Sequence, residues 1–204
     1  MSKKIDNAQT AYVAAIDTRL AVALSRNVSA TNAIKLTNMR DAFATSSELC
    51  ALFVNNKIDA SIFERAIYAL EKAVKFSAQL VNHKVAHNNV MMYCAFRTAI
   101  NAHVNRTTLH LSDIVACCSS SIKVDDARKS IVYQNAKHVD DSTVKAQHQS
   151  SLDALRMLNI ISERKDKRNE YDVNMNALAK ALCDKLAISY EQIEEVAEVE
   201  EATA

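Results

Sequence analysis

The sequence has no glycine, no proline and no tryptophan among its 204 residues. Average usage is about 7% glycine and about 5% proline, so most ordinary turn chemistry is missing. Type I′ and II′ hairpins depend on glycine, and many tight turns need proline or glycine. A strand-rich architecture is therefore disfavoured, and helices joined by asparagine- and aspartate-rich connections are expected.

The absence of glycine also excludes several kinds of active site. Glycine-rich phosphate loops, dinucleotide-binding fingerprints and nucleophile elbows all need a backbone that a side chain would block. No pair of carboxylates stands in an apolar context, and the spacing of Ser119, Ser120 and Ser121 relative to histidine and aspartate does not support a catalytic triad. We therefore expect no enzyme activity and no cofactor.

The five cysteines are few and scattered, and none belongs to a CxxC pair. An odd number without such spacing predicts neither a disulfide framework nor a zinc finger, so reduced thiols are expected. His83 and His87 have the helical spacing of a zinc site, but Lys84 stands where a metalloprotease has its catalytic glutamate. No third ligand is evident, so we expect ordinary surface histidines and no metal.

Charge is nearly balanced overall but not along the chain. The net charge is +1, and the last residues carry six glutamates without a base: Glu191, Glu194, Glu195, Glu198, Glu200 and Glu201. Residues 1–190 therefore carry +7, which suits a polyanionic partner without requiring one. Asp17 and Arg19 interrupt the first apolar stretch, so it is neither a signal peptide nor a membrane span. We expect a cytoplasmic protein without membrane contact.

Helical periodicity dominates the first 82 residues. An apolar stripe predicts a helix over 5–26, and a second run covers 29–44. Capping boxes at 45–48 and 61–64 predict a short helix ending at Asn55–Asn56 and a long amphipathic helix over 61–82. We interpret residues 1–82 as a helical association region, with homodimerisation through helix 61–82.

The pattern changes in the second half of the chain. It predicts, in order, a helix (90–103), a strand (108–111), helices (112–119, 126–137 and 142–157), two strands flanking the charged turn 165–169, and a helix (175–186). Asparagine and aspartate at the tip of the ribbon are the residues best able to replace glycine at positive φ. An acidic tail, 189–204, follows.

This order resembles the winged helix-turn-helix superfamily over about residues 84–186. The most telling part is Leu152–Ile161, which is similar to the end of that superfamily's recognition helix running into its first wing strand. Asn159 stands where a glycine is usual, and the segment 120–140 separates the two helices of the motif. The expected fold is mainly α: a helical N-terminal region, then a winged-helix-like domain over 83–188 with a small two- to three-stranded sheet.

Two surfaces are candidates for DNA contact under this resemblance. On a helical wheel of 100° per residue, helix 142–157 has one face that packs against the domain and a polar face that is directed towards DNA. A recognition helix in the major groove, with a wing on the backbone, implies these contact residues: Ser142, Thr143, Lys145, Gln149, Arg156, Lys165, Lys167 and Arg168.

Local charge keeps a second interpretation open. Residues 123–170 contain ten basic and eight acidic side chains, less basic than most specific DNA binders. The same polar face could simply be solvated. We expect a DNA-binding regulator of transcription or replication initiation with duplex DNA as partner. The alternative is a helical scaffold or adaptor whose wing, N-terminal region or acidic tail binds protein; such a short chain with few motifs would suit a virus.

Overall fold

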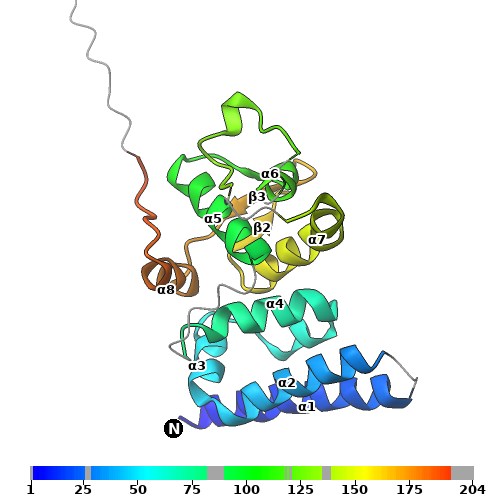
Figure 1. Ribbon diagram of the computed structural model, residues 1–204. Helices are drawn as coiled ribbons and strands as arrows, with labels where there is room; N and C mark the ends of the chain where they lie inside the picture. The colour runs from blue at the N-terminus through cyan, green and yellow to red at the C-terminus, as the bar shows by residue number, and fades with distance from the viewer. Residues whose placement is uncertain are drawn as a thin grey trace, which may run out of the picture.

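The chain folds into a mainly helical structure with a small three-stranded antiparallel sheet, as the sequence predicts. The computed structural model (Figure 1) describes residues 2–25, 29–81, 90–117, 119, 121–134 and 139–193. Its α-helices are α1 (Lys3–Ser25), α2 (Ala30–Thr45), α3 (Ser47–Asn55), α4 (Ile67–Ala78), α5 (Val90–Val104), α6 (Leu111–Ala116), α7 (Asp141–Met157) and α8 (Ala177–Leu186). Two 3₁₀ turns, η1 (Ala60–Glu64) and η2 (Asp126–Arg128), and strands β1 (Leu109–His110), β2 (Ile161–Glu163) and β3 (Glu170–Val173) complete it.

The N-terminal helices pack around a cluster of aromatic rings. Tyr12 of α1 contacts Phe43 of α2, Phe53 of α3 and Phe63 of η1, with ring centroids 5.1 to 6.1 Å apart. Tilted and edge-on contacts of this kind add to the stabilisation from burial. Burial, with smaller contributions from Cys50 and Asp59, raises the pKa of Tyr12 to about 12.

The expected long helix over 61–82 is wrong, because the segment breaks into η1 and α4. Asp59, not Ser61, caps the first turn by accepting a hydrogen bond from the Ser61 amide. Arg65 and Ala66 are then extended. The Arg19 guanidinium donates to the carbonyls of Phe63 and Arg65, which are thereby satisfied outside a continuous helix.

The apolar face of α4 is used inside the chain. Its buried residues are Ala69, Leu70, Lys72, Ala73, Val74, Phe76 and Ser77, and the helix packs against α2 and α7. That face therefore packs within the chain, and dimerisation through helix 61–82 stays a prediction.

In the second half of the chain, helices α5, α6 and α7 pack against a small sheet. The strand order is β1-β3-β2, with Leu109 opposite Tyr171 and Ile161 opposite Val173. Helices α5, α6 and α7 lie within a residue or a few of their predicted ranges. The expected helix 126–137 is wrong in its described part: only η2 forms, and residues 129–134 are turn or irregular. Residues 135–137 lie outside the described part.

Four helices end in the same motif without glycine. After α3, α5, α7 and α8, the residue in the left-handed region is Lys57 (φ 56°), Arg106 (φ 51°), Asn159 (φ 55°) and Ala187 (φ 52°). In each case the next amide donates to the carbonyl five residues earlier, as Ile188 does to Cys183 at 2.9 Å. This is the Schellman arrangement, in which glycine is usual. Asn169, in the β2–β3 turn, has φ 63°, so asparagine does take the place of glycine at positive φ in this turn.

One hydrophobic core runs through both halves, from Tyr12 to Ile188. Asn56, at the end of α3, connects them with polar contacts: its side-chain oxygen accepts from the Leu178 amide at 2.9 Å, and its carbonyl accepts from Asn159 Nδ2 at 3.2 Å. The N-terminal helices are thus fixed against the start of α8 and the end of α7.

Candidate nucleic-acid interface

The N-terminus of α7 is already occupied by carboxylates. Asp140 is the N-cap and accepts from the Thr143 amide at 3.0 Å and from the hydroxyls of Ser142 and Thr143. Those hydrogen bonds, led by the one from Ser142, lower the pKa of Asp140 to about 2. Asp141 accepts from the hydroxyls of Ser119 and Ser121. Ser142 and Thr143 therefore serve the cap, and two negative charges lie where a phosphate was expected.

The exposed edge of α7 brings together the other three predicted residues. Lys145, Gln149 and Arg156 are all exposed. Gln149 donates to Asp153 Oδ1 at 3.1 Å, and Arg156 pairs with Asp153 at 3.6 Å and Glu163 at 3.1 Å. Within the described residues, Lys145 makes no hydrogen bond or ion pair. Lys145 is thus the cation of the three that has no direct polar contact with a described residue, although its charge helps to lower the pKa of Asp141.

The β2–β3 turn carries the three predicted wing residues, and only one of them is paired. Lys167 lies 3.7 Å from Glu170, whereas Lys165 and Arg168 are exposed and have no ion pair to any described residue. Arg164, which the sequence did not single out, pairs with Asp166 at 3.0 Å and Asp172 at 3.9 Å. The carboxylates of the turn are held by Arg164 and Lys167, which leaves Lys165 and Arg168 available to a partner.

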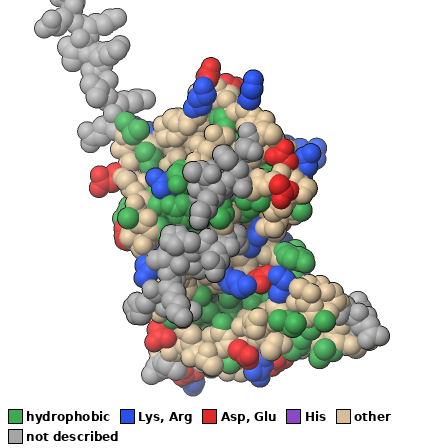
Figure 2. All heavy atoms as spheres, in the orientation of Figure 1, with side chains coloured by type: hydrophobic (Ala, Val, Ile, Leu, Met, Phe, Trp, Pro, Cys, Tyr) green, Lys and Arg blue, Asp and Glu red, His purple; other side chains and the backbone are tan. Residues whose placement is uncertain are grey.

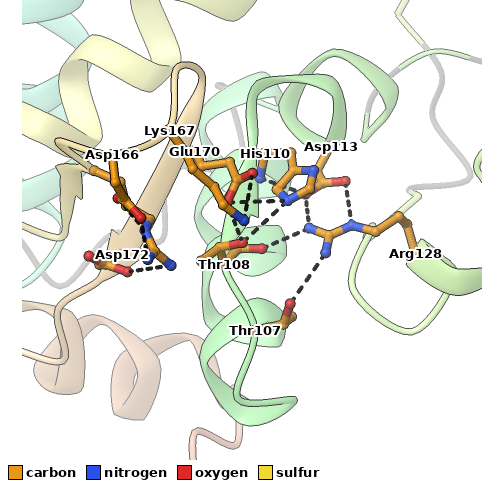
Figure 3. A network of polar contacts seen from close by, with 10 residues as sticks. Thr107, Thr108, His110, Asp113, Arg128, Asp166, Lys167, Glu170 and Asp172 are labelled. Atoms are coloured by element: carbon orange, nitrogen blue, oxygen red, sulfur yellow. Dashed lines mark hydrogen bonds and ion pairs between the residues drawn. The ribbon is translucent and has the colours of Figure 1, made fainter.

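The sequence did not predict the polar network that joins β1, α6 and the β2–β3 hairpin (Figure 3). Asp113 of α6 is buried, and it accepts from the His110 amide at 2.8 Å and from the Arg128 guanidinium through both oxygens. Arg128 also donates to the Thr108 carbonyl at 2.8 Å. Thr108 in turn donates to Glu170 of β3 at 3.2 Å. The network therefore holds the segment after α6 against β1 and the β2–β3 hairpin.

One part of this network could have been recognised from the sequence, and the rest could not. His110 three residues before Asp113 is the spacing of a helix cap whose carboxylate reaches back to the amide. The partner Arg128 lies 15 residues further along, in the segment that we expected to be helical. Only the fold brings it to Asp113.

A buried lysine joins α4 to α7. Lys72 is 7% exposed, and its ammonium donates to the Gln147 carbonyl at 3.0 Å and to the hydroxyls of Ser150 and Ser151 at 2.8 Å. Lys72 and Ser151 are therefore buried in the contact between α4 and α7. In Figure 1, α4 lies directly alongside α7.

Two cavities lie along the boundary between α7 and the N-terminal helices. One, of 780 Å³, is lined by α2, α4 and the first half of α7. The other, of 580 Å³, is lined by residues 57–66, the second half of α7 and β2. Both include Ala66 and Asp153, so they adjoin, and together they are called the groove along α7.

Other candidate sites receive no support from the described residues. Cys50, Cys94, Cys117 and Cys183 are buried, and burial raises the pKa of Cys50 to about 11 and of Cys183 to about 12. No group of three or more metal-ligating side chains occurs in the described part of the chain. Residues 82–89, with His83 and His87, lie outside that part, as do Cys118, Ser120 and the tail after 193. Among the described helices, none is long and apolar enough to span a membrane.

Comparisons with protein-family models, curated proteins and solved structures gave no match for this chain.

Proposed function

We propose that this protein binds duplex DNA through the exposed edge of α7 and the β2–β3 turn, as a regulator of transcription or replication initiation. The observation that carries the proposal is the element order α5-β1-α6-α7-β2-β3 together with the strand order β1-β3-β2. This arrangement is similar to that of winged helix-turn-helix domains. It attaches a β-turn directly to the helix that would enter the major groove.

The charges suit this role at three positions. Lys145 on α7 and Lys165 and Arg168 on the wing are exposed cations without an ion pair to described residues. Binding to phosphate releases condensed counterions, so each such contact contributes affinity that falls with salt. Gln149 and Arg156 also lie on this edge, and their side-chain N–H groups can donate hydrogen bonds to base edges. To bind a base, they would have to break their present contacts with Asp153 and Glu163.

Duplex binding can be tested by fluorescence anisotropy over a salt series. Neutralising three phosphate contacts in K145Q/K165Q/R168Q should reduce the slope of log affinity against log salt by about 2.7, since each contact contributes about 0.9. K3Q/K4Q/K180Q removes three exposed charges from α1 and α8 and should leave the slope unchanged. Absence of duplex binding by the unmodified chain at low salt would refute the proposal.

A second function, as an adaptor for a protein partner, is favoured by a separate observation. Four large apolar side chains of the N-terminal helices are 45 to 63% exposed: Val22, Leu24, Ile34 and Tyr68. Figure 2 shows hydrophobic side chains on the surface of the α1–α2 pair. Exposed apolar residues that gather in one region are typical of protein contact sites. A chain without salt-dependent duplex affinity would leave this as the better explanation.

A further inference from the structure

The groove along α7 has a charged wall that belongs to the N-terminal helices. Lys57 and Arg65 line the smaller cavity, and Lys75 lines the larger one. All three come from the segment 57–78, which the sequence assigned to self-association. They lie across the groove from α7, so this wall borders the helix proposed to read DNA.

The acids of the groove are already engaged by neighbours. Asp153 and Glu163 pair with Arg156, and Asp59 accepts from the Ser61 amide at 2.8 Å. Six basic side chains and four carboxylates line the two cavities, which gives the groove a net charge of +2. Lys57 and Arg65 are exposed and have no ion pair to described residues.

Glu71 is shared between two lysines at the other end. Its carboxylate contacts the Lys35 ammonium and lies 2.7 Å from Lys75 Nζ. Burial by itself raises the pKa of Glu71, but the hydrogen bonds from Lys35 and Lys75 outweigh it, and the net shift is downward. Lys35 is largely buried and lies 4.5 Å above the Tyr68 ring, whereas the Lys75 side chain is 63% exposed. Lys75 is therefore the member of this trio that can reach a partner.

We infer that Lys57, Arg65 and Lys75 form a second phosphate-binding strip beside α7, which contacts the sugar-phosphate backbone of a duplex bound there. This inference rests on the proposed function. A helix in the major groove, which is about 12 Å wide, is flanked by a sugar-phosphate backbone on each side. Lys57 and Arg65 share a cavity with the second half of α7 and β2, and Lys75 shares the adjoining cavity with the middle of α7. The N-terminal helices thus take part directly in DNA binding, beyond supporting the fold.

The test compares K57Q/R65Q/K75Q with the unmodified full chain on the same duplex. Loss of three contacts should reduce the salt slope by about 2.7, and at 0.1 M salt this corresponds to about a 500-fold loss of affinity. All three side chains are exposed, so the melting temperature should stay close to that of the unmodified chain. K3Q/K4Q/K180Q again serves as the charge-matched control.

The possible outcomes separate this inference from the proposed function. An unchanged slope in K57Q/R65Q/K75Q, together with a reduced slope in K145Q/K165Q/R168Q, would overturn the second strip and retain α7 and the wing. A loss seen with single-stranded DNA but not with the duplex would also overturn it. No duplex binding by the unmodified chain would overturn both.

Discussion

Replacing Ala187 with glycine should stabilise the protein. Ala187 is exposed and lies in the left-handed region (φ 52°, ψ 46°) directly after α8. This conformation costs an L-residue about 1 to 2 kcal/mol, and glycine adopts it without that penalty. Glycine loses about 0.5 to 1 kcal/mol more conformational freedom on folding. The difference leaves a gain of about 0.5 to 1 kcal/mol in the free energy of unfolding.

Urea denaturation and thermal melting measure this gain, and a matched substitution provides its control. For a chain of this size, 1 kcal/mol corresponds to about 2 to 4 °C in melting temperature. Ala14→Gly makes the same chemical change at an exposed position inside α1, where glycine should cost about 1 kcal/mol. The two variants should therefore shift stability in opposite directions. Destabilisation by Ala187→Gly would refute the reasoning.

Three further results are expected. Asp113→Asn should destabilise the fold by about 3 kcal/mol in urea denaturation, because it leaves the Arg128 guanidinium without its buried charge partner; a loss below 1 kcal/mol would contradict this. The folded-state pKa of Asp140, about 2, lies below its ordinary value of 3.8, so its stabilising effect is present above pH 4 and is lost as pH falls towards 2. Asp140→Ala should thus lower the melting temperature at pH 7, with a gap from the unmodified chain that narrows between pH 4 and 2; a constant gap would count against it. Cys50 and Cys183 should react with an aromatic disulfide reagent only on unfolding, since burial raises the pKa of both thiols; modification in the folded state, located by peptide mapping, would refute this.

Much of the fold could be predicted because its signals are local. The apolar stripe of α1 repeats every three or four residues, and this periodicity predicted the helix. A continuous apolar run predicted α5, and a capped segment predicted α7. The β2–β3 ribbon was predicted as two short strands on either side of a charged turn, whose asparagine tolerates positive φ as glycine does.

The errors arose where distant residues override a local pattern. Ser61–Glu64 has the spacing of a capping box, yet Arg19 binds the carbonyls of Phe63 and Arg65 from 44 and 46 residues away and the helix breaks. Arg128 similarly pairs with Asp113 outside any helix. Neither contact can be recognised from the local sequence, because its two partners lie far apart in the chain.

The sequence predicted that the candidate residues on α7 are exposed, but not which contacts they make. A helical wheel placed Lys145, Gln149 and Arg156 on one face, and the structure exposes all three. It could not show that Asp153 and Glu163 engage Gln149 and Arg156, or that Asp140 engages Ser142 and Thr143. These pairings depend on rotamers and on the path of β2, which the wheel does not contain.

The contact between α4 and α7 has a consequence for how the protein can be divided. A fragment beginning at α5 would retain α5–α8 and the sheet but lose Lys72 and the apolar face of α4. It would expose Ala154 and Ser151, which are fully buried in the whole chain, and Leu178 would lose the Asn56 side chain that caps its amide. Such a fragment should aggregate or melt early, and any weak DNA binding by it would reflect a damaged helix surface. Limited proteolysis should likewise produce no long-lived C-terminal fragment.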